Sequence, residues 1–271
     1  MIPDWDDAYS NAAHIAGGEC YPGQWAALAK AFRAELLPAG RAELDLPYGP
    51  AERETLDLFR PVGKAEGSAI FAHGGYWMAF DKSSWSHLAA GALGRGWAIC
   101  IPSYTLAPEA RISEISRQFA RAISFAADRT SGPLRLAGHS AGGHLVTRMV
   151  CEDSVLPVGV RSRIGHVVSI SGLHDLRPLL CTTMNATLRM DEAEATAESP
   201  ALGWPMTQCS VTCWVGSDER PEFLRQNDLL ANIWTGLGAG MRSVRVDGRH
   251  HFNVIEDLAN PGSKLTEAFV G

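Results

Sequence analysis

The sequence lacks the features that mark several common classes of protein. No segment reaches about 18 uninterrupted apolar residues, so we expect neither a membrane-spanning helix nor a membrane partner. Basic runs are missing, and 24 Lys and Arg against 30 Asp and Glu give a net charge of −6, which argues against a nucleic-acid partner. Residues 1–7 are acidic and have no cationic segment followed by an apolar run, so we expect no signal peptide there.

The six cysteines form no CxxC motif and no disulfide framework. Cys100 lies in an apolar run and Cys151 ends a helical pattern, as small core residues do in a reducing compartment. Cys209 and Cys213 have no matching His or Cys pair, so a metal site there is not expected. These patterns predict a cytoplasmic protein without a metal site at its cysteines.

Low-complexity segments and repeats are also absent, whereas short apolar runs are frequent. The chain has 271 residues, of which 46% are hydrophobic and 20% charged, as in an average globular protein. Short runs without polar residues suit strands that are buried on both faces of a sheet. The predicted strands are residues 68–72, 97–101, 134–137, 167–170, 211–215 and 243–246.

Helical patterns alternate with these runs, for example over residues 112–126 and 223–237. Alternating strands and helices predict an α/β fold, with a mostly parallel central sheet and helices on both faces. Residues 41–60 alternate polar and apolar side chains around Gly49-Pro50, which predicts an antiparallel N-terminal hairpin. We interpret residues 1–271 as a single domain, with N-terminal helices over 4–37 and an insertion over 173–208 that forms a lid.

The sequence Gly138-His139-Ser140-Ala141-Gly142 follows a predicted buried strand and precedes a predicted helix. G-x-S-x-G in this context places the serine on a tight turn, where its hydroxyl projects from the sheet edge. The start of the helix directs free N–H groups towards the reacting oxygen. We therefore predict that Ser140 is a nucleophile, and we assign His139 and His144 structural roles.

A second glycine-rich loop, His73-Gly74-Gly75-Tyr76-Trp77, follows the first predicted buried strand. Attack on a carbonyl creates negative charge on oxygen, which requires preorganised donors. We predict an oxyanion hole made by Gly74, Gly75, Tyr76 and Ala141, with the main-chain N–H groups of Gly75, Tyr76 and Ala141 as donors. We expect His73 to brace this loop.

A serine hydroxyl needs an adjacent base. In α/β folds that carry the G-x-S-x-G turn, the three groups follow one another along the chain in the order serine, acid, histidine. His251 is the favoured base and His250 the alternative, because both follow the last predicted strand. We also expect Phe252 to start the apolar face of a terminal helix. The acid follows the preceding strand, where Glu219 is favoured over Asp218, and Asp175 is a third candidate.

Taken together, these motifs resemble those of the kynurenine formamidase (arylformamidase) family within the α/β-hydrolase superfamily, near the esterases of the hormone-sensitive-lipase type. The similarity spans most of the chain after residue 68. It rests on HGGYW at 73–77, SYTLAPEA at 103–110, GHSAGGHL at 138–145, SGLHDL at 171–176, VGSDERPEF at 215–223 and HHF at 250–252.

The resemblance implies Ser140 as nucleophile, His251 as base and residues 74–77 as the oxyanion loop. The acid of the family is normally Asp, whereas the aligned residue here is Glu219, with Asp218 beside it. The implied reaction is hydrolysis of N-formylkynurenine to kynurenine and formate through an acyl-enzyme, with no cofactor. A broad short-chain carboxylesterase is the alternative, and a non-catalytic ligand-binding protein is the alternative from another class.

Aromatic and cationic side chains are candidates for contact with such a substrate. Tyr76 and Trp77 would narrow the side of the cavity that holds the acyl group of the substrate. One of Phe80, Trp85 or Trp204 would stack on its aryl group. The cations that could meet a substrate carboxylate are Arg177, Arg189 and Arg220, among which the sequence does not choose. The expected partner is a small acyl amide or ester, and a homodimer is compatible with the sequence.

Overall fold

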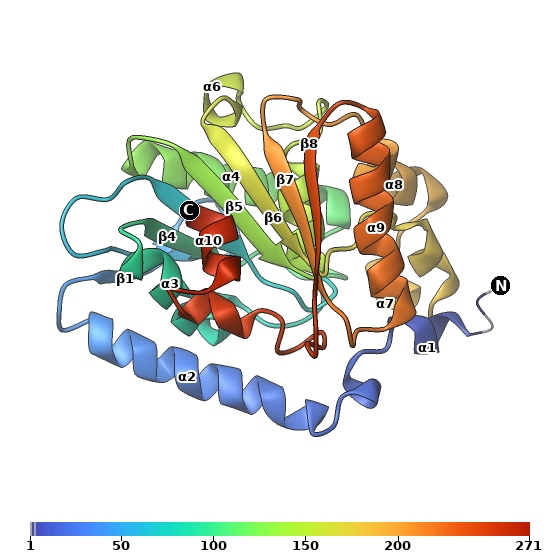
Figure 1. Ribbon diagram of the computed structural model, residues 1–271, viewed down its shortest axis with the longest axis horizontal. Coiled ribbons are helices and arrows are strands. Elements are labelled where there is room, and N and C mark those ends of the chain that lie inside the picture. Colours follow the sequence, from blue (N-terminus) through green and yellow to red (C-terminus); the bar gives the residue numbers. More distant parts are fainter. Residues whose placement is uncertain (1, 3) are drawn as a thin grey trace.

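The computed structural model describes residues 2 and 4–271. Residues 1 and 3 of the acidic N-terminal stretch therefore lie outside the described residues. Eight strands form one twisted sheet in the order β1-β2-β4-β3-β5-β6-β7-β8 (Figure 1). The strands are β1 (Ala42–Pro47), β2 (Thr55–Phe59), β3 (Ser68–Ala72), β4 (Ala98–Pro102), β5 (Leu134–His139), β6 (Ile164–Ile170), β7 (Ser210–Gly216) and β8 (Gly240–Val246).

Strand direction confirms the predicted α/β fold. β1 pairs antiparallel with β2, β2 pairs antiparallel with β4, and every other neighbouring pair is parallel. The antiparallel pair is the predicted hairpin. Because β3 to β8 run in one direction, the loops that leave their carboxyl ends gather at one edge of the sheet, which is where open α/β sheets bind ligands.

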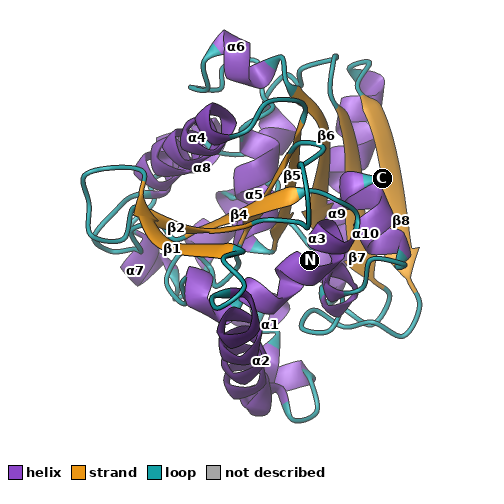
Figure 2. Ribbon diagram, turned by 90° about the vertical axis from the view of Figure 1, so that its left-hand side faces the viewer, coloured by secondary structure: helices purple, strands orange, loops and turns teal. Residues whose placement is uncertain are grey.

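Helices cover both faces of the sheet (Figure 2). They are α1 (Trp5–Tyr9), α2 (Tyr21–Leu36), α3 (Ala89–Gly94), α4 (Ile112–Arg129), α5 (Ala141–Arg148), α6 (Val158–Arg161), α7 (Asn185–Leu188), α8 (Glu192–Ala197), α9 (Pro221–Gly236) and α10 (Lys264–Val270). The N-terminal region predicted as helical thus contains α1 and α2, which are separated by short 3₁₀ turns.

Two apolar cores form on the two faces, because successive strand side chains point in opposite directions. Ile70 of β3 belongs to the core beneath α4, α5 and α9, whereas its neighbour Phe71 belongs to the core beneath α2, α3 and α10. Each fully buried side chain of this size contributes roughly 1.5–3 kcal/mol. Burial on both faces therefore explains why the central strands contain almost no polar residues.

The N-terminal segment lies along the edge at which β7 and β8 end (Figures 1 and 2). Trp25 of α2 anchors it, with its ring centroid 4.7 Å from that of Trp85 and 5.3 Å from that of Phe252. Aromatic pairs of this kind add about 0.5–1.5 kcal/mol beyond the burial of area. The packing of Trp25 therefore holds this segment beside the ends of the strands.

The insertion over residues 173–208 contains α7, α8 and two 3₁₀ segments, Arg177–Cys181 and Pro200–Leu202. Side chains attach it to the rest of the molecule. Ser116 of α4 donates to Glu198 over 2.7 Å, and the indole N–H of Trp234 donates to the Pro200 carbonyl over 3.1 Å. A lid movement of this insertion stays a prediction.

The chain after His251 differs from the expectation. Phe252 lies in a turn rather than at the start of a terminal helix, and α10 begins only at Lys264. Asn260-Pro261-Gly262 explains the delay, because proline and glycine interrupt helices. Ser263 then caps α10 by accepting from the Thr266 N–H over 3.0 Å.

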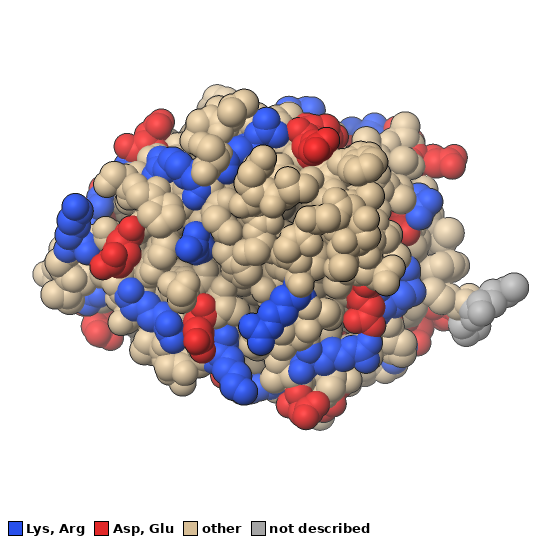
Figure 3. Space-filling model, turned by 45° about the horizontal axis from the view of Figure 1, so that its top comes forward, with Lys and Arg blue, Asp and Glu red and all other residues tan. Residues whose placement is uncertain are grey.

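Charged side chains of both signs are interspersed over the face of the molecule that Figure 3 presents. Within residues 2 and 4–271, none of the helices has the length and apolar character needed to span a membrane.

Candidate active site

Ser140 occupies a strained turn between β5 and α5. Its backbone has φ 56° and ψ −116°, in the left-handed half of conformational space that side chains other than glycine avoid. The residue is 2% exposed and lines a cavity at the carboxyl edge of the sheet. Such strain persists only where the surrounding structure imposes it.

The two glycines of the G-x-S-x-G sequence allow this turn because the surrounding main chain leaves no room for a side chain at either position. A Cβ atom on Gly138 would lie 2.1 Å from the carbonyl oxygen of Gly142. A Cβ atom on Gly142 would lie 2.0 Å from the carbonyl oxygen of Ala72. The end of β3, the elbow and the first turn of α5 therefore touch through their main chains.

The loop after β3 approaches Ser140 equally closely. Gly75 has φ 110°, and a Cβ atom on Gly74 would lie 3.1 Å from the Ser140 Cβ. Within the described residues, the main-chain N–H groups of Gly74, Gly75, Tyr76 and Ala141 donate to no protein acceptor. Free donors beside a serine hydroxyl are what an oxyanion hole requires, and that role stays a prediction.

His73 and His139 support the two loops. The His73 ring stacks on Tyr104 with centroids 4.4 Å apart, and its Nδ1–H donates to the Gly74 carbonyl over 2.8 Å. Complete burial lowers the pKa of His73 to about 4, so the ring is neutral near pH 7. His139 Nε2–H donates to the main-chain oxygen of His251 over 2.9 Å, which ties the elbow to the loop after β8.

His251 lines the cavity after β8, and its ring meets Glu219, which follows β7. The Nδ1–H of His251 donates to Glu219 Oε2 over 2.6 Å, and both side chains are buried. The second oxygen, Oε1, accepts from the Ser171 hydroxyl at 2.5 Å and from the Gly216 N–H at 3.0 Å. Because the carboxylate fixes the proton on Nδ1, the Nε2 lone pair is available as a base.

The alternative residues have other partners. Asp218 is exposed and accepts from Ser217 over 2.8 Å. His250 contacts the Tyr21 hydroxyl at 3.2 Å and accepts from main-chain N–H groups. Asp175 pairs with Arg177 at 2.9 Å.

Ser140, His251 and residues 74–76 line one cavity of about 460 Å³. The Ser140 hydroxyl and the His251 ring are not hydrogen-bonded to each other in this structure, although both line that cavity. Catalytic hydrogen bonds are often long without substrate and shorten when it binds. Glu219 is hydrogen-bonded to Nδ1 of the His251 ring. The fold thus gathers the favoured nucleophile, base and acid.

Much of the remaining lining was not found by sequence reasoning. Asp6, Asn11 and Trp25 come from the N-terminal segment, and Thr183 and Met184 come from the insertion. No local pattern marks these residues, because they reach the cavity only through tertiary packing.

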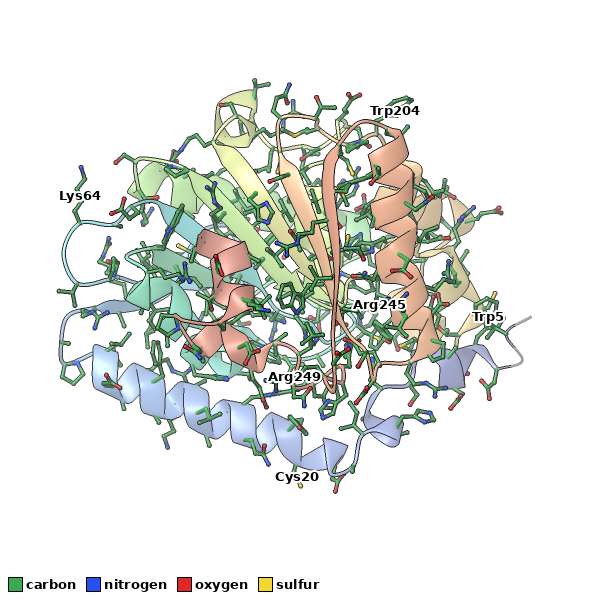
Figure 4. All side chains as sticks on the ribbon, viewed as in Figure 1. Trp5, Cys20, Lys64, Trp204, Arg245 and Arg249 are labelled. Carbon is green, nitrogen blue, oxygen red and sulfur yellow. The ribbon has the colours of Figure 1, made fainter. Side chains whose placement is uncertain are left out.

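The residues proposed for substrate contact separate into two groups. Tyr76, Phe80 and Trp85 line the cavity, and the Tyr76 hydroxyl donates to the Tyr9 carbonyl over 2.6 Å. Trp77 is fully buried against His144, 5.1 Å between ring centroids, and does not line the cavity. Trp204 is 62% exposed at the opposite end of the sheet from Arg249, which follows β8 (Figure 4).

The three candidate cations lie outside the cavity lining. Arg177 pairs with Asp175, and Arg220 pairs with Asp7. Within the described residues, no three His, Cys, Asp or Glu side chains gather as a metal site, and the six cysteines are free thiols.

Comparison with known proteins identifies the family. The family model for the α/β hydrolase fold matches residues 69–226. Kynurenine formamidase from Danio rerio is 30% identical over 233 residues, covering 83% of this chain and 79% of the relative. The chain is a kynurenine-formamidase-like member of the α/β-hydrolase superfamily. The Drosophila melanogaster kynurenine formamidase is 25% identical and covers 84% of this chain and 76% of its own.

Solved structures of α/β hydrolases agree with this assignment. The crystal structure of a proposed thioesterase from a Silicibacter species is 51% identical, with a TM-score of 0.94 and 99% coverage of both chains. An esterase from Pyrobaculum calidifontis shares the fold, with 17% identity, a TM-score of 0.69 and coverage of 95% of this chain and 94% of its own. The family supports a hydrolase.

We predict that Gly142→Ala lowers the free energy of unfolding by about 3 kcal/mol, because its Cβ would overlap the Ala72 carbonyl. The matched control is Gly159→Ala on α6, where a Cβ meets no atom within 4 Å. Chemical denaturation measures both. Equal stability of the two variants would contradict the close contact at the elbow.

We predict that Glu219→Gln lowers kcat/KM for p-nitrophenyl acetate by about 10³–10⁴-fold, because the amide no longer stabilises the charged imidazole. Asp218→Asn, one residue away, should stay within about twofold. Steady-state assays with both purified variants measure this difference. A larger loss in Asp218→Asn would reassign the acid.

Proposed function

We propose that this protein is a serine hydrolase that removes a formyl group from an aromatic amide, converting N-formylkynurenine to kynurenine and formate. The observation that carries the proposal is the Glu219–His251 hydrogen bond beside the strained Ser140 turn, within an aromatic-lined cavity. The curated kynurenine formamidases among the relatives support the same reaction.

In the first step, Ser140 Oγ attacks the formyl carbon and its proton passes to His251 Nε2. Glu219 stabilises the imidazolium that forms. The carbonyl oxygen becomes an oxyanion, which accepts from the free N–H groups of Gly75, Tyr76 and Ala141. Each such donor is worth about 2.7–4 kcal/mol in the transition state.

In the second step, His251 returns the proton to the amide nitrogen, and the C–N bond breaks. Kynurenine leaves and a formyl ester remains on Ser140. Water then attacks this ester while His251 again accepts a proton. Collapse of the second tetrahedral intermediate releases formate and restores the Ser140 hydroxyl.

The surroundings of Ser140 suit a very small acyl group and a flat leaving group. Gly74 approaches the Ser140 Cβ closely, and the Tyr76 hydroxyl is fixed by the Tyr9 carbonyl, so this side of the cavity is confined. Aromatic side chains offer stacking faces to an aryl ring. They are Trp25, Phe80, Trp85 and Phe252.

We predict that Ser140→Ala abolishes labelling by a fluorophosphonate and reduces hydrolysis by at least about 10⁴-fold. Cys100→Ser, a buried thiol in β4, serves as the control and should still be labelled. Labelling that persists in Ser140→Ala would show that another residue is the nucleophile.

We predict that kcat/KM for N-formylkynurenine exceeds the values for acetyl and butyryl p-nitrophenyl esters and for short acyl thioesters. The confined acyl side favours a formyl group over longer chains. A kinetic panel with these substrates decides the question. Faster turnover of the acetyl and butyryl esters would instead identify a short-chain carboxylesterase.

A further inference from the structure

The lining of the cavity carries one negative charge, that of Asp6, which has no role in the proposed reaction. Among its described lining residues, Asp6 is the only carboxylate, and none is Lys or Arg. A lining of this composition attracts cations and repels anions. The carboxylate that kynurenine carries therefore finds no cationic side chain here.

Asp6 is exposed to solvent, and Thr183 of the insertion holds one of its two carboxylate oxygens. Its Oδ1 accepts from the main-chain N–H of Thr183 at 2.7 Å and from the Thr183 hydroxyl at 2.9 Å. Its Oδ2 accepts no hydrogen bond from another described residue. The neighbouring Asp7 is different, because it pairs with Arg220 and with His14. Of these two adjacent carboxylates, the one that lines the cavity has no cationic partner.

A second acceptor lies in the same wall. Asn11 also lines the cavity and is 7% exposed, and its side-chain oxygen has no hydrogen-bond donor among the described residues. Buried amide oxygens are normally paired, so the Asn11 oxygen is an unsatisfied acceptor in the wall of the cavity.

We propose that the leaving group of the substrate carries an ammonium group that Asp6 binds, and that the cavity disfavours a leaving group with net negative charge. This inference rests on the proposed function, which sets the acyl group and the aryl amine of the substrate. It adds the charge that the alkyl chain of the substrate carries. The preferred substrates are formanilides with an aminoalkyl chain and no carboxylate. N-formylkynurenine, a zwitterion, ranks between these and the anionic analogues.

The test uses three 2-formamidophenyl ketones whose alkyl chains end in an ammonium, a methyl or a carboxylate group. We expect kcat/KM for the cation to exceed that for the anion by about tenfold, with the neutral compound between them. Asp6→Asn keeps an acceptor for Thr183 and should reduce the ratio to about twofold or less. Asp6→Lys should invert it.

Glu35→Gln is the matched control, because Glu35 is an exposed carboxylate on α2 outside the cavity lining. It should keep the tenfold ratio. Added salt should reduce the ratio in the unmodified protein, since screening weakens attraction between exposed charges. An unchanged ratio in both Asp6 variants, or a wild-type preference for the anion, would overturn the inference.

The same series made as aryl formate esters separates this inference from the proposed function. If formanilides are not hydrolysed but the esters show an Asp6-dependent preference, the formamidase function is wrong and the ammonium site stands. If formanilides are hydrolysed without an Asp6-dependent preference, the ammonium site is wrong and the formamidase function stands.

Discussion

Main-chain contact at the end of β3 is the constraint on which the site depends. Gly142 lies against the Ala72 carbonyl, and Gly138 lies against Gly142, so no side chain separates the elbow from the neighbouring strand. This packing imposes the positive φ of Ser140, which local preferences alone would not select. It also brings the loop with Gly74 beside the serine, so the proposed nucleophile and the free N–H donors depend on the same packing.

The pair of His251 and Glu219 adds a buried polar connection between the ends of three further strands. Glu219 receives hydrogen bonds from Ser171 after β6 and from Gly216 at the end of β7, and it holds His251 after β8. A buried carboxylate is stable only when its oxygens are well paired. These bonds thus support the protein while fixing the tautomer of the ring.

The N-terminal segment gives the cavity a character that the hydrolase core does not have. The family model begins at residue 69, whereas Asp6, Asn11 and Trp25 lie before it. The core supplies Ser140, Glu219 and His251, which we propose as the reacting groups. The segment and the insertion supply another part of the lining, to which Asp6, Asn11, Trp25, Thr183 and Met184 belong.

The sequence by itself determined the alternation of strands and helices along the chain and the residues proposed as reacting groups. Period-two and 3.6-residue patterns report burial locally, and G-x-S-x-G needs its glycines for a local turn. Only the tertiary structure separated Glu219 from Asp218, excluded Trp77 from the cavity lining and brought Asp6 into it. Adjacent residues share almost the same sequence context, whereas the packing of distant segments decides which of their side chains point inward.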